Sequence, residues 1–219
     1  MTKKLNILVV EDKEENILAA QHYLSAHVVT PARTFYDAVS HLRRKENSYD
    51  VLLSDMFFSY GNHCTSSSGS FSEAPLGYAT ALYAARVGVP LIAIVTDCNH
   101  HSNAIAASFD AFYPGSTHYE KDDHPLLSHE RILMKDPTNK VRPVLRINNS
   151  LFLMFDERDL PADDDMPYCD LHMTDFTPIT SERAHIIQDM AVGRSKELIK
   201  RIKPWRTALE VMLTLRQEH

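Results

Sequence analysis

The sequence lacks the features that mark secreted, membrane-spanning and zinc-ribbon proteins. Its three cysteines, Cys64, Cys98 and Cys169, are far apart and form no CxxC pair, so they indicate neither a disulfide framework nor a zinc ribbon. No apolar run approaches the roughly 18 residues that a membrane span needs. The opening MTKKLNILVVED also lacks the longer apolar region and the cleavage site of a signal peptide. We therefore expect a cytoplasmic protein with free thiols and no membrane segment.

An excess of basic residues is also missing. The formal net charge of the 219 residues is −6 at pH 7, which argues against a nucleic-acid-binding surface over the whole chain. Basic residues do gather between Arg183 and Arg216, but no helix-turn-helix is visible there, and they suit the polar face of an amphipathic helix. With 44% apolar residues, the chain can bury one sizeable core. We expect a soluble globular protein with no clear nucleic-acid binding, although a local basic patch could still exist.

Apolar runs alternate with helical patterns along the chain. Continuous apolar runs predict strands at 5–10, 28–30, 50–55 and 90–97. Apolar positions at helical spacing predict helices at 13–27, 34–42, 78–87, 104–112 and 195–218. In the last of these, Pro204 marks a break or a fresh first turn. Strands that alternate with helices of this length are typical of βαβ units, and hence of a parallel sheet with right-handed crossovers.

Two stretches do not fit this alternation. A Ser- and Gly-rich stretch at about 59–76 is too long for an ordinary connection between a strand and a helix. A second stretch, at about 114–193, contains Pro-rich turns and the segment RILMKDPTNKVRPVLRI, which predicts a hairpin. We interpret residues 1–219 as one elaborated domain, with a core at 4–113, a closing helix at about 195–218, and these two stretches as insertions.

Acidic residues follow the predicted strands. Glu11 and Asp12 end the first strand, Asp55 ends the third, and Thr96 with Asp97 ends the fourth. Because the carboxyl ends of parallel strands lie along one edge of a sheet, we expect these residues to converge. Carboxylates that share a small volume repel one another unless a divalent cation neutralises them, and oxygen ligands favour Mg²⁺. Glu11, Asp12 and Asp55 are therefore a predicted metal site.

Three strand motifs, ILVVED, YDVLLSD and GVPLIAIVTD, occur in this order within residues 5–113. In kind and order they resemble the first, third and fourth strands of the receiver domain of two-component response regulators. The resemblance implies an α/β fold, a flavodoxin-like three-layer sandwich. In that fold five parallel strands lie in the order 2-1-3-4-5, with helices on both faces of the sheet.

The same resemblance implies a function. Asp55 would accept a phosphoryl group from a histidine kinase or a small phosphodonor, Glu11 and Asp12 would bind Mg²⁺ together with Asp55, and Thr96 would be the switch that hydrogen-bonds the phosphoryl oxygen. Magnesium that bridges the donor and acceptor oxygens would offset the charge of the transfer. We expect a phosphoacceptor regulator rather than a turnover enzyme. Its output would be an unidentified protein partner, with a homodimer as one form of that contact.

The family also has a lysine at the end of its fifth strand, and here two residues are candidates for it. Lys135 has the better local motif, ILMKDP, whereas Lys121 is nearer to the expected spacing. If SLFLMFDER is the fifth strand instead, its end offers only Asp156, Glu157 and Arg158.

The stretch TDCNHHSN adds polar residues beyond the fourth strand. Asn99, His100 and His101, with Asp97, are additional candidate ligands that would shift the metal preference toward manganese, iron or zinc. Imidazole is also a base near neutral pH. Asn99 and the histidines equally suit the polar start of a helix.

Several departures from the family pattern keep other functions open. The segment DMFFS lacks the proline that usually follows the acceptor, Gly77 comes only after the long stretch, and Asp97 replaces a small residue. A pseudo-receiver, which keeps the fold and the acidic pocket as an interaction module without relaying phosphate, is the main alternative. A metal-dependent phosphohydrolase that uses the acids with His100 or His101 is a third reading.

Overall fold

The computed structural model of the chain describes residues 3–44, 46, 48–61, 74–96, 129–135, 141–156, 160, 163 and 202–217. The strands are β1 (Asn6–Val10), β2 (Val28–Ala32), β3 (Val51–Ser54), β4 (Leu91–Thr96), β5 (His129–Lys135), β6 (Val141–Ile147) and β7 (Ser150–Asp156). The helices are α1 (Glu14–Tyr23), α2 (Phe35–Arg43), α3 (Leu76–Arg86) and α7 (Trp205–Gln217). None of the helices in these ranges is long and apolar enough to cross a membrane. The predicted helix at 104–112 lies outside the described residues.

All the described strands belong to one sheet, in the order β2-β1-β3-β4-β7-β6-β5. β1 pairs in parallel with β2 and β3, β3 with β4, and β4 with β7. These five strands have the order 2-1-3-4-5 of a flavodoxin-like fold, which confirms the predicted topology. The fifth parallel strand is β7, which contains SLFLMFD.

The other two strands extend the sheet beyond this parallel part. β5 pairs with β6 in an antiparallel hairpin, and β6 pairs antiparallel with β7. The hairpin predicted from RILMKDPTNKVRPVLRI is therefore confirmed. Lys135 is the last residue of β5, so its strand is the outermost one and is not the fifth parallel strand.

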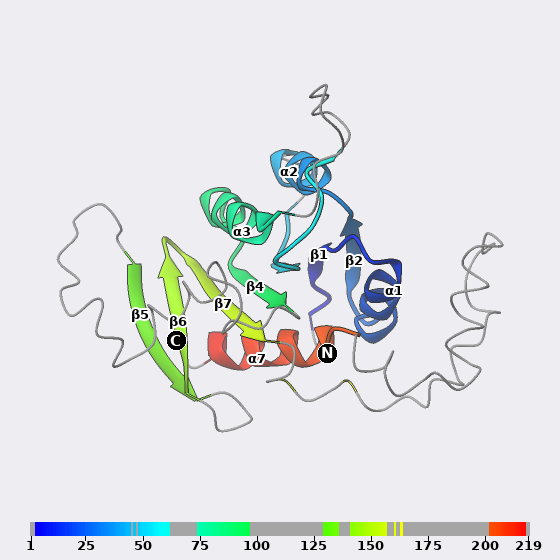
Figure 1. Cartoon of the computed structure of the whole chain (residues 1–219). Coiled ribbons are helices and arrows are strands. Elements are labelled where there is room, and N and C mark those ends of the chain that lie inside the picture. Colours follow the sequence, from blue (N-terminus) through cyan, green and yellow to red (C-terminus); the bar gives the residue numbers. More distant parts are fainter. Residues whose placement is uncertain are drawn as a thin grey trace.

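Helices cover both faces of the parallel strands (Figure 1). Side chains that alternate along β1 point to opposite faces: Ile7 and Val9 join a core with α1 and α7, whereas Leu8 and Val10 join a core with α2 and α3. The central strands are continuous apolar runs because both of their faces are covered. The structure is therefore the predicted three-layer sandwich.

The two ends of the long stretch predicted at about 59–76 lie next to each other in the structure. Phe58 and Ala74 form an antiparallel bridge that closes the stretch, and α3 begins two residues later. The amide of Gly77 donates to the carbonyl of Met56 at 3.0 Å. A Cβ at Gly77 would lie 2.5 Å from the carbonyl oxygen of Asp55, so only glycine allows α3 to approach the end of β3 this closely.

The closing helix starts next to Pro204, where the sequence predicts a break or a fresh first turn. Residues 195–201 lie outside the described residues, Ile202 to Pro204 are not helical, and α7 begins at Trp205. The cause is local, because a residue that precedes proline is disfavoured in the helical conformation, and this applies to Lys203. The start of α7 is fixed by the buried carboxylate of Asp163, which accepts hydrogen bonds from the amides of the second and third helical residues.

Candidate functional site

Three carboxylates meet at the carboxyl edge of the parallel strands. Val10 of β1 and Ser54 of β3 are register partners, so Glu11 and Asp55, the residues that follow them, leave the sheet side by side. One oxygen each from Glu11, Asp12 and Asp55 lies within 4.8 Å of the others. The predicted convergence of these acids is therefore found in the structure, and strand register accounts for the proximity of Glu11 and Asp55.

Asp55 is held firmly at this edge and is only 2% exposed. Its amide donates to the carbonyl of Val10 at 2.8 Å, which continues the ladder between β1 and β3. Its Oδ1 accepts a hydrogen bond from the amide of Met56 at 2.6 Å. Burial raises the pKa of the Asp55 carboxyl above its ordinary value, while the nearby Lys203 ammonium opposes that rise. The ionised form of Asp55 therefore depends on Lys203.

Lys203 brings a buried positive charge to the site. Its Nζ lies 2.7 Å from Oδ2 of Asp55 and 2.8 Å from Oε2 of Glu11, and the side chain is 0% exposed. Burial by itself would lower the pKa of Lys203, but the two carboxylates outweigh burial and hold this pKa above the ordinary lysine value. The ammonium is therefore charged, and it binds two of the three acids at once.

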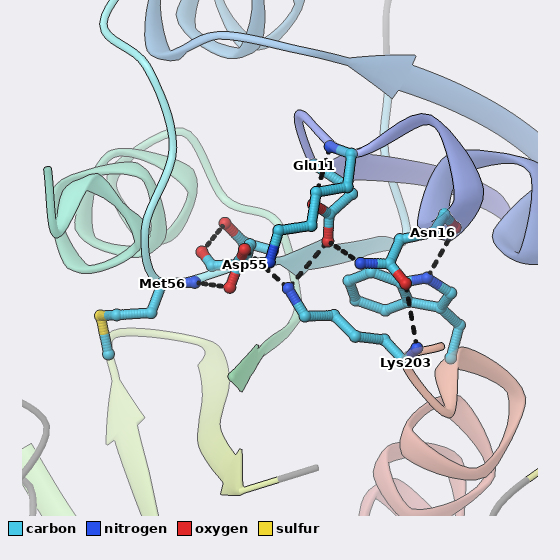
Figure 2. A network of polar contacts seen from close by, with 8 residues as sticks. Glu11, Asn16, Asp55, Met56 and Lys203 are labelled. Carbon is cyan, nitrogen blue, oxygen red and sulfur yellow. Dashed lines mark hydrogen bonds and ion pairs between the residues drawn. The ribbon is translucent and has the colours of Figure 1, made fainter. Parts of the chain in front are cut away.

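Asn16 of α1 connects these groups (Figure 2). Its Nδ2 donates to Oε2 of Glu11 at 3.1 Å, and its Oδ1 accepts from the backbone amide of Lys203 at 3.2 Å. The indole Nε1 of Trp205 donates to the backbone carbonyl of Asn16 at 2.9 Å. The other carboxylate oxygen of Glu11 accepts from the amide of Lys13 at 3.0 Å. Glu11, Asn16, Asp55, Lys203 and Trp205 are thus joined in one connected network.

The remaining predicted residues fall into two groups. Thr96 is buried at the end of β4, the strand next to β3, and so lies at the same edge of the sheet as Asp55. Lys135 ends β5, which is separated from β3 in the sheet by β4, β7 and β6. The candidates outside the described residues are Asp97, Asn99, His100, His101 and Lys121.

Sequence reasoning missed Lys203 because the family pattern places the lysine directly after the fifth strand. Here β7 ends at Asp156, and the lysine that pairs with Asp55 comes much later in the sequence, at position 203. A local signal was nevertheless present. Lys203 lies between Ile202 and the Pro204-Trp205 pair at the start of an apolar helix, and a lysine in such a setting is seldom buried unless it is ion-paired.

Comparison with solved structures finds receiver domains. The non-phosphorylated HemR receiver domain from Leptospira biflexa is 20% identical, with a TM-score of 0.32, over 43% of this chain and 65% of its own, slightly less than two thirds. A two-component response regulator from Clostridium difficile is 16% identical, with a TM-score of 0.35, over 48% of this chain and 75% of its own. A response regulator receiver domain protein from Clostridium thermocellum is 16% identical, with a TM-score of 0.35, over 89% of this chain and 98% of its own.

No family model and no curated protein matches the sequence. The chain has a flavodoxin-like α/β fold extended by an antiparallel hairpin, which follows from the order and direction of its strands. The cluster of Glu11, Asp12 and Asp55 at the carboxyl edge resembles the phosphoacceptor site of receiver domains.

Proposed function

We propose that this chain is a receiver-like signalling domain in which Asp55 accepts a phosphoryl group in the presence of Mg²⁺. The observation that carries the proposal is the setting of Asp55. Its carboxylate is buried at the carboxyl edge of the sheet, 2.7 Å from a buried ammonium and close to two further acids. A carboxylate in this setting is oriented by its neighbours and partly shielded from water, as a nucleophile requires.

The acids fit a magnesium ion in both chemistry and charge. Glu11, Asp12 and Asp55 offer oxygen ligands within 4.8 Å of one another, and oxygen is the donor that Mg²⁺ prefers. Lys203 pairs with Glu11 and Asp55, and a divalent ion would bring further positive charge to the three carboxylates. Bound there, the ion would offset the charge on the phosphoryl group during transfer.

The transfer itself needs few groups. An oxygen of Asp55 forms a bond to the phosphorus of a phosphohistidine or an acyl phosphate, and the bond from phosphorus to the leaving nitrogen or oxygen breaks. The leaving group keeps the electron pair of that bond, and imidazole takes up a proton from solvent. The hydrogen bond from the amide of Met56 orients the carboxylate, and the Lys203 ammonium offsets the negative charge of the product.

Signalling would follow from the new charge at position 55. Thr96, buried at the end of the neighbouring strand, is the residue we propose as the switch that hydrogen-bonds the phosphoryl group. Recruitment of Thr96 would shift the population between two conformations and so change a contact with a protein partner. A histidine kinase or a small phosphodonor is the proposed phosphoryl source.

The test is intact mass after incubation of the full chain with acetyl phosphate and Mg²⁺. We expect one added phosphoryl group on the wild type and none on Asp55→Asn. Asp50→Asn is the matched control, because Asp50 precedes β3 at the opposite end of the strand and should keep the adduct. The result against the proposal is a folded wild type that gains no phosphoryl group.

One observation favours a second candidate, the pseudo-receiver that no longer relays phosphate. The ammonium of Lys203 binds both Asp55 and Glu11. A buried ion-pair arrangement of this kind also fits a purely structural role, in which no phosphoryl group is transferred. The sole tryptophan, Trp205, has its ring centroid 5.7 Å from Nζ of Lys203, so its fluorescence can report on the site. A fluorescence response to Mg²⁺ without any phosphoryl adduct would support the pseudo-receiver.

A further inference from the structure

The strands of the sheet do not by themselves determine the position of the Lys203 ammonium. Lys203 lies between the fifth parallel strand and α7 along the chain and belongs to neither. The acids, in contrast, directly follow β1 and β3, whose ladder fixes them. Contacts made by individual side chains must therefore decide where the Lys203 ammonium lies.

Asn16 makes contacts that meet this need. It is 1% exposed, and both ends of its side-chain amide are used. The Oδ1 atom accepts from the backbone amide of Lys203, and the Nδ2 atom donates to Oε2 of Glu11. That same Oε2 atom pairs with Nζ of Lys203 at 2.8 Å. Asn16 therefore fixes the backbone of Lys203 directly and its ammonium through Glu11, which closes a ring of polar contacts.

We propose that Asn16 is a positioning residue that holds the Lys203 ammonium against Asp55. For its effect on phosphoryl transfer, this inference rests on the proposed function. The amide of Asn16 supplies a donor to Glu11 and an acceptor for Lys203 from the two ends of one short side chain. Aspartate would face Glu11 with a second carboxylate, and leucine, of similar size, would leave the buried amide of Lys203 without its acceptor.

Asn16 has no evident local reason to be at this position. It is the third residue of α1, and the hydrogen bonds of its side chain go to Glu11 and Lys203, not to the backbone of α1. Its backbone carbonyl, which accepts from Trp205, would serve equally well in any residue. The side chain is thus the part that distinguishes Asn16, and its two hydrogen bonds both lead to the site.

The experiment observes the lysine directly in the full chain. A buried, ion-paired ammonium exchanges its protons slowly and gives a resolved ¹⁵N side-chain signal, which can be assigned because Lys203→Arg removes it. In Asn16→Leu we expect proton exchange at Lys203 to accelerate at least about tenfold, the size of effect that one lost buried hydrogen bond produces. If Asn16→Leu fails to fold, Asn16→Ser is measured instead. Serine keeps one polar group, so we expect a smaller acceleration of proton exchange at Lys203.

Asp163→Ala is the matched control. It removes the carboxylate that fixes the start of α7 but leaves Asn16, Glu11 and the ammonium intact. We expect the slow Lys203 signal to persist in Asp163→Ala at temperatures well below its unfolding transition. The inference is overturned if the folded Asn16 variant keeps the wild-type signal, or if Asp163→Ala loses it to the same extent, because α7 docking alone would then explain the effect.

The rate of phosphorylation by acetyl phosphate separates this inference from the proposed function. If the wild type is phosphorylated, we expect Asn16→Leu to react about tenfold more slowly and Asp163→Ala at nearly the wild-type rate. If the wild type is not phosphorylated, the proposed function fails. The ammonium signal still decides whether Asn16 positions Lys203.

Discussion

The acids and the lysine of the site reach the same place by different routes. Glu11 and Asp55 each follow a parallel strand, and the register of β1 with β3 puts them together. Lys203 comes from a segment far along the chain and is held by side chains, chiefly Asn16 and the acids themselves. The acidic half of the site is thus a property of the sheet, whereas the basic half depends on tertiary contacts. We expect the basic half to be the more easily disturbed.

The largest effect on stability should come from removing the ammonium. Lys203→Met leaves Asp55 and Glu11 buried without their counter-charge, and this should lower the free energy of unfolding by about 3–5 kcal/mol, measured by urea denaturation. The double variant Lys203→Met with Asp55→Asn should recover part of this loss, since one uncompensated charge is gone. A loss under about 1 kcal/mol in the single variant would contradict the buried ion pairs.

A second prediction tests the acidic half through the backbone. Gly77→Ala places a Cβ 2.5 Å from the carbonyl oxygen of Asp55 and 2.8 Å from Cα of Met56, so the end of β3 must shift. We expect a loss of about 1–3 kcal/mol in the free energy of unfolding, together with slower phosphorylation. Gly88→Ala is the control: its φ of +89° makes alanine strained, but the added Cβ meets nothing within 4 Å. Slower phosphorylation in the Gly88 variant as well would contradict a local effect at the site.

A third prediction concerns the anchoring of α7. Asp163→Ala removes the acceptor for the amides of Arg206 and Thr207, and this should cost about 1–2 kcal/mol of unfolding free energy, the range seen for lost helix caps. Thermal or urea unfolding followed at the sole tryptophan, Trp205, would measure it. An unchanged unfolding curve would show that Asp163 does not fix the start of α7.

The smallest effect is expected at the exposed end of the sheet. Lys3 pairs with Asp50 at 2.8 Å, but the side chain of Lys3 is 74% exposed. Lys3→Met should therefore change the free energy of unfolding by less than about 1 kcal/mol. The contrast with Lys203→Met, measured under the same conditions, isolates the contribution of burial to an ion pair of nearly the same length. Equal losses in the two variants would contradict this distinction.

The sequence predicts the acidic half well because that half depends on local patterns. The apolar runs before Glu11 and Asp55 identify two strands, and the rule that parallel strands end at one edge brings the acids together. The same reasoning identifies Thr96 at the end of β4. None of these inferences needs a contact between residues that are distant in sequence, beyond the pairing of the strands.

The lysine could not be predicted in this way. Its place depends on contacts of residue 203 with residues 11, 16 and 55, and no spacing rule connects them. The choice of Lys135 followed from a strand motif, but its strand, β5, is the outer member of a hairpin added beyond β7. The close contact of Gly77 with the end of β3 is also hard to predict from the sequence, because a long insertion separates the two.

The most direct measurement of the central claim locates the phosphoryl group itself. The full chain is phosphorylated with acetyl phosphate and Mg²⁺ and then reduced with borohydride, which converts an aspartyl phosphate to homoserine, and its peptides are mapped by mass spectrometry. We predict that the converted residue is at position 55 and that no other aspartate is converted. Conversion at a different residue, or none in a folded protein that binds Mg²⁺, would contradict the account.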